Sequence, residues 1–420
     1  MASISSYGAK LRQSATLFEA LREYPAYRRY WLGNLASVSA QQMMWITQGW
    51  LIYDLTGSTA YLGLAGLVSA LPAIALNLVG GVVADRFDQR RVITLTQIGS
   101  AALVFILATL TATGVVQPWH ILAAAFVTGA LQAFNNPARQ SIFPHLIDRK
   151  DLMKAISLNS MVWQGTRIIA PALGGVSVAA FGASVSLYIS SVGLLALAFA
   201  VSGVHLERGE GRAKASMLQE LGVGLAYIRS NFLFTFLIGM TFFNSFFGVS
   251  MLQLLPAFAE DILDIGPSGL GMMYSAGGIG SLLGIAVIGS LTDYDRKGLL
   301  IIGGATAYGV AVLVFAASPL FAMSLVALFF MGLFQSIFTI SIQTALQMRV
   351  PDELRGRVMG VYGMTYHAGP LGALQAGLVA SALGPQIAVA IGAVFVIAFS
   401  LGVASMNQQV RRLQSPAAAA

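Results

Sequence analysis

Residues 80–91 read Gly80-Gly81-Val82-Val83-Ala84-Asp85-Arg86-Phe87-Asp88-Gln89-Arg90-Arg91, and they separate two long apolar runs. A short, arginine-rich loop between apolar runs is typical of the cytoplasmic side of a membrane protein, because basic loops are retained on that side. This rule does not explain Gly81 and Asp85, a glycine and a carboxylate four residues apart at the end of a run. The same spacing returns at Gly289 and Asp293, which indicates a repeated unit.

The other basic residues follow the same rule along the whole chain. All of the 24 Lys and Arg residues except Arg167 lie in or beside every second gap between apolar runs. The gap after residue 138, for example, holds Arg139, Arg149, Lys150 and Lys154. The intervening gaps contain acids such as Asp54 and Asp264 and no basic residue. The sequence therefore predicts a multi-pass protein of the inner (plasma) membrane with both termini in the cytoplasm.

Composition supports an all-α membrane protein, since 56% of the residues are hydrophobic and only 10% are charged. A membrane span needs about 20 mostly apolar residues. Twelve runs fit, at 30–53, 59–84, 92–113, 118–138, 153–180, 183–205, 231–258, 266–292, 298–317, 319–346, 355–382 and 384–406. They are called spans 1 to 12 below. An even number of spans agrees with two basic termini on one side.

Several functions are excluded by what the chain lacks. It has no cysteine, so disulfides and thiolate metal sites are absent, and its four histidines are scattered. The net charge of +7 is distributed by loop rather than gathered in a patch, so we expect no nucleic-acid partner. The chain shows neither a nucleophile–base set nor a phosphate-binding glycine loop. We therefore expect no enzyme and no cofactor.

The two halves of the chain look like copies. Gly81–Asp85 matches Gly289–Asp293, Leu152 matches Leu354, and Pro171 matches Pro370, in the same order and at offsets near 200 residues. Turn residues separate several spans on the acidic side: Gly57, Gly182, Ser318 and Gly384. The sequence predicts an N-terminal six-helix bundle (1–205), a cytoplasmic linker with an amphipathic helix (206–230) and a C-terminal six-helix bundle (231–420). Duplicated halves are the plan of many secondary transporters, whose binding site lies between them.

Residues 80–91 resemble the signature loop between spans 2 and 3 of the major facilitator superfamily. Twelve spans and duplicated halves extend this resemblance over essentially the whole chain. The resemblance implies that Gly81 permits close helix approach and that Asp85 caps a helix in the other half. It also implies that Arg86 and Arg90 form charge pairs across a cytoplasmic gate. The second copy, around Asp293, is degenerate, and an ordinary basic loop is the alternative reading of the arginines.

Two further stretches refine the resemblance. Residues 167–175, with Pro171 followed by Gly174 and Gly175, look like the span-5 signature of exporters in this superfamily, although Ala170 replaces a glycine. Pro171 is expected to kink the helix and to take part in gating, whereas a packing surface without bearing on direction is the alternative. Residues 42–58 are similar to span 1 of the branch that contains the enterobactin exporter and related drug exporters. The mid-span-4 arginine of drug antiporters is missing.

Arg167 is the main candidate for substrate binding. A cation inside a span costs about 2.5–3.5 kcal/mol on insertion scales, so it faces protein or water. No carboxylate occupies the middle of any span, and Arg167 is therefore free to bind an anionic or phenolate substrate. The alternative is a structural arginine satisfied by carbonyl groups and by amides such as Gln132.

Neutral polar side chains within the spans predict a mostly uncharged binding cavity. The residues expected to contact substrate, besides Arg167, are Trp45, Gln48, Gln132, Asn135, Gln164, Asn244, Gln335, Tyr366 and His367. Other interior-like polar residues are Gln41, Asn159, Gln253 and Gln343. His367 and Asp54 are the candidates for proton coupling, because an imidazole titrates near neutrality. The alternative is that these side chains are hydrogen-bonded packing groups between helices.

The resulting functional hypothesis is a secondary active transporter working by alternating access. By resemblance, it exports a bulky amphipathic small molecule, siderophore-like or drug-like, in exchange for protons. We expect a monomer whose partners are its substrate, protons and the lipid bilayer. Two alternatives remain: an importer or facilitator of a small organic solute on the same fold, and a non-transporting membrane sensor or scaffold.

Overall fold

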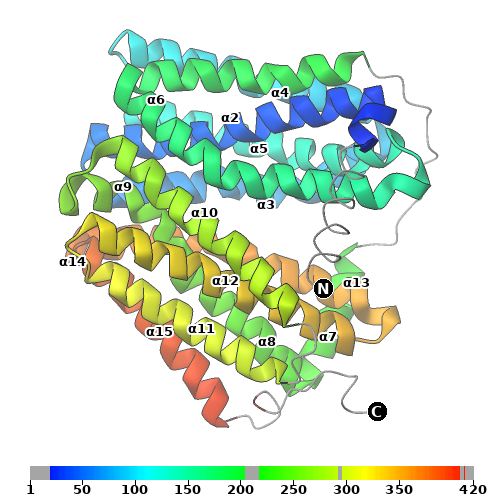
Figure 1. Ribbon diagram of the computed structural model, residues 1–420, viewed down its shortest axis with the longest axis vertical. Helices are drawn as coiled ribbons and strands as arrows, with labels where there is room; N and C mark the ends of the chain where they lie inside the picture. The colour runs from blue at the N-terminus through cyan, green and yellow to red at the C-terminus, as the bar shows by residue number, and fades with distance from the viewer. Residues whose placement is uncertain (1–18, 204–216, 292–295, 407–410, 412–420) are drawn as a thin grey trace, which may run out of the picture. The chain divides into compact units, whose positions relative to one another are not determined.

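The computed structural model describes residues 19–203, 217–291, 296–406 and 411 (Figure 1). Within these ranges the chain is helical, contains no β-strand and makes twelve helical passes, so the predicted all-α membrane fold is confirmed. The predicted linker falls largely outside the described residues. The amphipathic helix expected after it is observed as α7 (Met217–Ser230).

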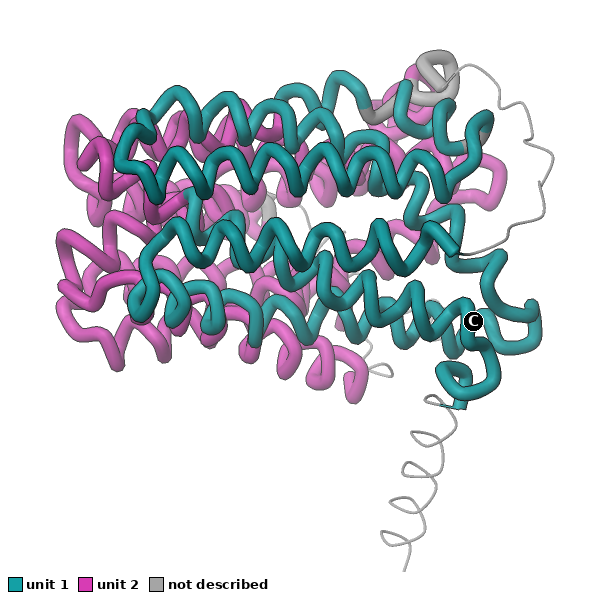
Figure 2. The backbone as a smooth tube through the Cα atoms, turned by 90° about the horizontal axis from the view of Figure 1, so that it is seen from above, with its two compact units in different colours: residues 1–48, 71–212 teal, residues 49–70, 213–420 magenta. Residues whose placement is uncertain are grey.

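The chain forms two compact units (Figure 2). Unit 1 consists of residues 1–48 and 71–212, and unit 2 of residues 49–70 and 213–420. The boundaries between the units fall inside the first two long helices, so residues 49–70 pack with the C-terminal part of the chain. This assignment makes the acidic-side ends of spans 1 and 2 part of unit 2.

The first six passes are built from five long helices. They are α2 (Pro25–Thr56), α3 (Thr59–Arg86), α4 (Gln89–Ala112), α5 (Pro118–Ile142) and α6 (Leu152–Ser202). Two short 3-10 turns, η1 (Phe143–His145) and η2 (Arg149–Asp151), connect α5 to α6. Helix α4 begins where it does because the Asp88 carboxylate accepts a hydrogen bond from the Arg90 backbone N–H at 2.9 Å.

The last six passes are less regular. Span 7 is divided into α8 (Phe232–Phe243), a π-turn η3 (Asn244–Gly248), η4 (Val249–Leu254), α9 (Leu255–Ala257) and a second π-turn η5 (Phe258–Ile262). The other helices are α10 (Gly266–Ser290), α11 (Lys297–Ala316), α12 (Phe321–Arg349), α13 (Asp352–Thr365), α14 (Gly369–Leu383) and α15 (Pro385–Met406). A 3-10 turn, η6 (Tyr366–Ala368), separates α13 from α14.

The predicted duplication is visible in the backbone. Gly182 divides α6 into two passes and has φ 83° and ψ 164°. Gly384, between α14 and α15, has φ 88° and ψ 153°. Such left-handed extended angles favour glycine. Two turns 202 residues apart therefore use the same residue in nearly the same conformation.

The two prolines that marked the duplication behave differently. Pro171 lies inside α6, where only Gly182 departs from helical dihedral angles. Pro370 stands near the N-terminus of α14, directly after the break at η6. The helix is thus interrupted at the C-terminal copy, whereas the backbone keeps helical dihedral angles at Pro171, and the kink expected there stays a prediction.

One predicted span boundary is wrong in a way that matters for function. Span 4 was expected to end at residue 138, with Arg139 in the following loop. Helix α5 continues to Ile142, and Arg139 is 4% exposed. Eight described stretches are long and apolar enough to be candidate membrane spans by composition, and α2 and α5 are not among them. Their polar side chains lower their hydropathy, and these side chains form the site described next.

Close helix contacts fix the packing inside each unit. A Cβ at Gly80 would lie 2.0 Å from the Ala133 carbonyl oxygen, so α3 approaches α5 at a residue with no side chain. In unit 2 the equivalent contact brings Gly284 of α10 to α12, where a Cβ would lie 2.4 Å from the Leu333 carbonyl oxygen. A Cβ at Gly81 would meet nothing within 4 Å. The close approach expected of Gly81 is thus made by its neighbour Gly80.

Candidate functional site

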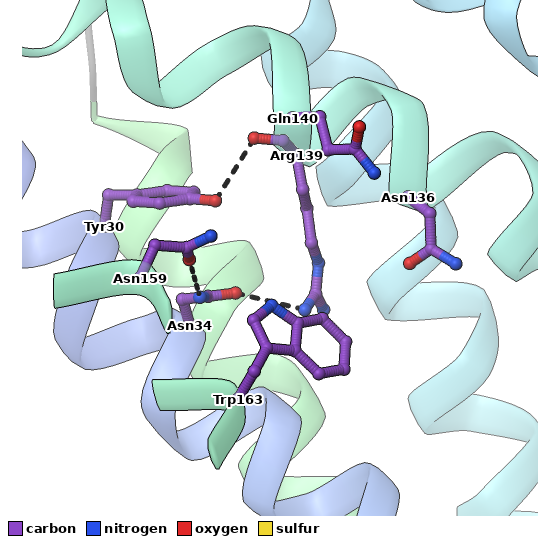
Figure 3. Close-up of a pocket in the computed structure, with 7 residues that line it drawn as sticks. All are labelled: Tyr30, Asn34, Asn136, Arg139, Gln140, Asn159 and Trp163. Atoms are coloured by element: carbon purple, nitrogen blue, oxygen red, sulfur yellow. Dashed lines mark hydrogen bonds between the residues drawn. The ribbon is translucent and has the colours of Figure 1, made fainter. Parts of the chain in front are cut away.

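A polar cavity of about 340 Å³ lies in unit 1 beside the last turns of α5 (Figure 3). The residues that line it are Tyr30, Asn34, Asn136, Arg139, Gln140, Asn159 and Trp163. Each helix presents its residues at helical spacing: Tyr30 and Asn34 on α2, Asn136 and Gln140 on α5, and Asn159 and Trp163 on α6. Three helices therefore converge on Arg139, and we call this cavity the Arg139 pocket.

The Arg139 guanidinium is held by neutral groups. Its Nη1 donates to the Asn34 Oδ1 at 3.1 Å, and its Nη2 donates to the Ser37 Oγ at 2.6 Å. Asn34 in turn donates to the Asn159 Oδ1 at 3.0 Å. The Ser37 hydroxyl also accepts from Gln97 of α4 at 2.9 Å. The position of the cation is thus fixed by hydrogen bonds to α2, and the α2 side chains that accept them are in turn bonded to α4 and α6.

The charge of Arg139 is not neutralised by any described side chain. None of the ion pairs among the described side chains includes Arg139, and its Nε has no hydrogen-bond partner. A buried cation is strongly penalised unless an anion or several hydrogen bonds compensate it. The Arg139 pocket is therefore suited to a negatively charged ligand group, for which a guanidinium offers paired N–H donors.

A polar seam continues from the pocket along α2 and α5. Asn135 donates to the Thr96 hydroxyl at 2.7 Å, and its own Oδ1 is buried without a partner. The other unpartnered buried atoms on the seam are Gln41 Nε2, Gln48 Nε2 and Gln132 Oε1. A buried polar atom without a partner costs about 1–3 kcal/mol, so several together in one seam indicate a place where ligand or water supplies the missing bonds.

Unit 2 contains a smaller, uncharged polar group. Gln335 of α12 donates to the Asn244 Oδ1 at 2.9 Å and lies 3.4 Å from the Thr339 hydroxyl. Asn244, 3% exposed, begins the π-turn of span 7, an irregularity frequent at functional sites. Asn244 Nδ2 and Gln335 Oε1 are buried without partners. This pair is therefore bonded internally but retains one free donor and one free acceptor.

The acidic side of unit 2 joins the first two passes to spans 7 and 11. The Tyr53 hydroxyl donates to the Asp261 carboxylate, and the Thr59 hydroxyl donates to the Gly377 carbonyl at 3.0 Å. A Cβ at Gly63 would lie 2.5 Å from the Ala373 carbonyl oxygen. Asp54, a proton-coupling candidate, is exposed at this end.

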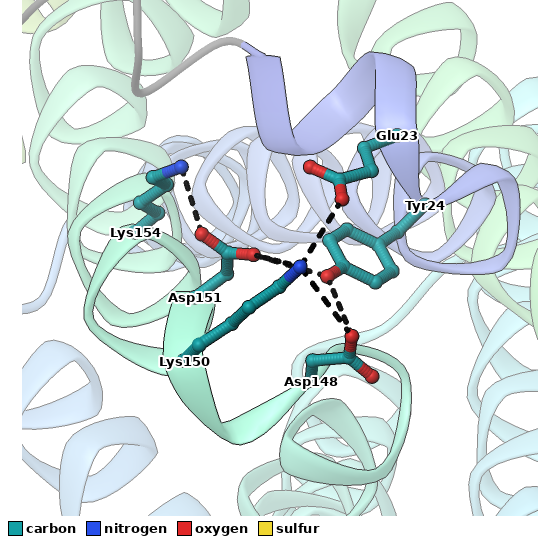
Figure 4. A network of polar contacts seen from close by, with 6 residues as sticks. All are labelled: Glu23, Tyr24, Asp148, Lys150, Asp151 and Lys154. Atoms are coloured by element: carbon teal, nitrogen blue, oxygen red, sulfur yellow. Dashed lines mark hydrogen bonds and ion pairs between the residues drawn. The ribbon is translucent and has the colours of Figure 1, made fainter.

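A charged network stabilises the opposite, basic end of unit 1 (Figure 4). The Tyr24 hydroxyl donates to Asp148 at 3.1 Å and to Asp151 at 3.0 Å, and Lys154 pairs with Asp151 at 2.7 Å. Lys150 lies 3.6 Å from Glu23 and within 4.0 Å of both aspartates. Burial, with the hydrogen bonds to the two carboxylates, raises the pKa of Tyr24 above its ordinary value. The tyrosine thus stays protonated and ties the start of α2 to the connection before α6.

The predicted substrate residues are distributed over both units. Gln48 is buried, Gln132 and Gln164 are half-buried, and Trp45 is exposed. Tyr366 is exposed in the η6 break, and its hydroxyl lies 2.8 Å from that of Tyr362. His367, in the same turn, is exposed.

Arg167, the main candidate from the sequence, is exposed on α6, and it makes no hydrogen bond or ion pair with a described side chain.

The predicted gating residues of the 80–91 loop are only partly described. Arg86 is exposed at the end of α3. Arg90 pairs with Asp88 at 3.2 Å, at the N-terminus of α4. Asp85 lies in the last turn of α3, and its side chain is outside what the structure describes, as is the whole of Asp293. The gating roles of these residues remain predictions.

Arg139 is the functional candidate that sequence reasoning missed. It was counted among the loop residues because the apolar run of span 4 fades at residue 138. A signal was nevertheless present, since Gln132 and Arg139 are two helical turns apart and mark one polar face that extends past the apolar run.

The described residues contain no group of three or more metal-ligating side chains.

Comparison with known proteins decides the family. A family model described as "Transmembrane secretion effector" matches residues 15–419. The chain belongs to this family of major facilitator superfamily transporters. It is therefore a membrane transporter of a small molecule and not an enzyme, and it is a multi-pass inner-membrane protein.

Curated relatives of this transporter include named exporters. The enterobactin exporter EntS of Citrobacter koseri is 24% identical over 413 residues, covering 96% of this chain and 97% of the relative. The multidrug efflux pump Tap of Mycolicibacterium fortuitum is 27% identical over 348 residues, covering 80% and 84%. Among solved structures, the nucleoside transporter NupG matches with a TM-score of 0.74 at 16% identity, covering 91% of this chain and 98% of that one. The structural match supports the fold alone.

Proposed function

We propose that this transporter exports a bulky, amphipathic, anionic small molecule by alternating access, in exchange for protons. Export is proposed because the curated relatives EntS and Tap are named as an exporter and an efflux pump. The cargo is proposed to be siderophore-like or drug-like on the same ground. The negative charge of the cargo is proposed from the residues of unit 1.

The observation that carries the proposal is Arg139, a buried cation with only neutral described partners. An anionic cargo group would supply the missing charge and accept from the unpartnered Nε. Arg167 supports the same reading. It stands one helical turn beyond Trp163 on α6, near the face that lines the Arg139 pocket, and it is exposed. The two arginines are proposed as successive contacts for the anionic group.

Proton coupling is the second part of the proposal. The sequence places no carboxylate in the middle of a span, so the proton carriers are sought at the ends and breaks of the helices. His367 in the η6 break and Asp54 at the acidic end are both exposed and able to exchange protons. The basic ends, with both termini, are proposed to face the cytoplasm, and Gly81, Asp85, Arg86, Arg90, Pro171 and Asp293 are proposed to control opening.

The test uses everted membrane vesicles energised to an acid interior, with naphthoyl-aminohexanoate and its methyl ester as probes. A proton-coupled exporter accumulates the carboxylate probe, and an uncoupler abolishes the accumulation. Arg139→Gln is expected to remove accumulation of the carboxylate while sparing the neutral ester. Arg91→Gln is the matched control, because the Arg91 side chain is 79% exposed in the first turn of α4.

Three results separate the proposal from its alternatives. Equilibration of the probe without accumulation, unaffected by the uncoupler, would indicate a facilitator. Accumulation in right-side-out vesicles only would indicate an importer. No movement of any amphipathic anion would favour a sensor or scaffold.

A further inference from the structure

Two pairs of amide side chains recur at matching positions in the two units. Gln41 of α2 and Gln132 of α5 form the pair in unit 1, and Asn244 of η3 and Gln335 of α12 form the pair in unit 2. Gln41 and Asn244 are 203 residues apart, as are Gln132 and Gln335. The pairs are therefore copies produced by the internal duplication.

Each pair leaves the same two atoms without partners. In unit 1 these are Gln41 Nε2, a donor, and Gln132 Oε1, an acceptor. In unit 2 they are Asn244 Nδ2, a donor, and Gln335 Oε1, an acceptor. In both units the free donor belongs to the first span of the half and the free acceptor to the fourth. The pattern is thus repeated in chemistry as well as in position.

Helical register places the unit 1 pair on facing stripes. Asn34 of α2 bonds Arg139 of α5 directly, which fixes one crossing point of these antiparallel helices. Gln41 is seven residues after Asn34, and Gln132 is seven residues before Arg139, which is two helical turns in each case. Both amides therefore continue the polar seam away from the Arg139 pocket, in the same direction.

The unit 2 pair shows that the free atoms survive even when the amides bond each other. Gln335 donates to the Asn244 Oδ1 at 2.9 Å, yet one N–H group and one carbonyl oxygen are left over. Turning both amides over would exchange the roles and still leave one donor and one acceptor. Two amide groups that bond only to each other therefore leave one N–H donor and one carbonyl acceptor unpaired, whichever way round they are placed.

We infer that each of these amide pairs, within its own unit, hydrogen-bonds a carboxamide group of the cargo, which offers one carbonyl acceptor and one N–H donor. This inference rests on the proposed function, since it assigns a second chemical feature to the same cargo. Gln132 and Gln335 accept from the cargo N–H group, while Gln41 and Asn244 donate to its carbonyl oxygen. The cargo class is an amphipathic anion that contains amide linkages.

The test compares two probes that differ by one atom group. Naphthoyl-aminohexanoate has an amide linkage, and naphthoyl-hydroxyhexanoate has an ester, which lacks the N–H donor. Both carry the carboxylate, so any contribution of Arg139 cancels in the ratio of their affinities. Equilibrium binding to the purified full-length protein is expected to favour the amide about tenfold or more, because the ester leaves the acceptor oxygens unpaired.

Variants assign that preference to individual atoms. The double variant Gln132→Leu, Gln335→Leu removes both acceptors and is expected to bind the two probes equally. The double variant Gln41→Leu, Asn244→Leu removes both donors and is expected to weaken the binding of both probes. Gln375→Leu is the control, because Gln375 of α14 is half-buried and is not among the described residues with an unpartnered buried atom. Thermal melting establishes that each variant is folded.

Either of two results would overturn the inference. One is that the wild-type protein binds amide and ester equally, or binds neither. The other is that the preference survives in Gln132→Leu, Gln335→Leu. Arg139-dependent export of carboxylates without amide preference would overturn this inference and leave the proposed function intact. Amide preference without any dependence on Arg139 would contradict the proposed function instead.

Discussion

At the level of Arg139, the contact between the first and fourth spans is polar in unit 1, and at the matching level of unit 2 it is apolar. In unit 1, Arg139 of α5 bonds Asn34 and Ser37 of α2. The residue 203 positions after Arg139 is Ile342 of α12, which is 0% exposed. The facing part of α8 buries Phe234, Leu237 and Met240, and all four residues belong to one hydrophobic cluster.

This difference teaches that the fold does not require the polar cluster. At the matching level of unit 2, the contact between these two spans is made by hydrocarbon side chains. Replacing a buried charged group by packed apolar residues is often neutral or stabilising. A cation kept at this position in only one of two copies therefore supports the proposed role of Arg139 in binding.

Moving the cation to the other unit gives the largest expected effect. Ile342→Arg places an unpaired charge in the apolar cluster of unit 2 and is expected to destabilise the protein by at least about 3 kcal/mol. Thermal melting of the purified protein measures the change, with Ile342→Met as control, expected to cost less than about 1.5 kcal/mol. A wild-type melting temperature for Ile342→Arg would show that both contacts tolerate a cation. The difference between the Arg139 contact of unit 1 and the Ile342 contact of unit 2 would then carry no information about function.

A feature shared by the two units is expected to respond alike in both. Gly80→Ala and Gly284→Ala each force a methyl group against a facing carbonyl oxygen, at ideal distances of 2.0 and 2.4 Å. Each substitution is expected to cost about 1–3 kcal/mol in thermal unfolding. Gly81→Ala, with nothing within 4 Å of its Cβ, is the control and is expected to be neutral or slightly stabilising. A loss at only one of the two glycines would show that the helix contacts are not equivalent.

Converting the unit 1 contact toward that of unit 2 is expected to change stability little. Arg139→Met removes the cation and leaves the Asn34 Oδ1 without that donor, while Ser37 keeps its bond from Gln97. The two effects oppose each other, so we expect a net change within about 1 kcal/mol in thermal unfolding. A fall of several kcal/mol would instead mean that Arg139 is structural.

The smallest effect is expected at the basic end of unit 1. Tyr24→Phe removes the hydrogen bonds to Asp148 and Asp151 and is expected to cost about 1 kcal/mol or less, because the network is partly exposed. Tyr61→Phe is the control, since Tyr61 is 38% exposed and its hydroxyl has no described hydrogen bond. Cargo binding is expected to be unchanged in both variants. A loss of cargo binding in Tyr24→Phe would show that this network influences the Arg139 pocket.

The sequence was sufficient for the fold because spans and turns leave strong signals. Twelve apolar runs and the turn residues Gly57, Gly182 and Gly384 located the helical passes to within a few residues. The site was harder to locate, since the polar residues that build it interrupt the apolar runs of α2 and α5. The ends of these helices therefore cannot be read from hydrophobicity. Arg139 was consequently placed in a loop. Which amides lack partners depends on packing between helices, which no pattern along one helix reveals.

The central claim is that Arg139 binds the anionic group of the cargo, and equilibrium binding tests it most directly. Affinities of naphthoyl-aminohexanoate and its methyl ester are measured for the wild-type protein and for Arg139→Gln. The account predicts that the wild type prefers the carboxylate by roughly ten- to a hundredfold, from a charge-assisted bond of about 1.5–3 kcal/mol, and that Arg139→Gln binds both alike. An undiminished preference for the carboxylate in Arg139→Gln would contradict it.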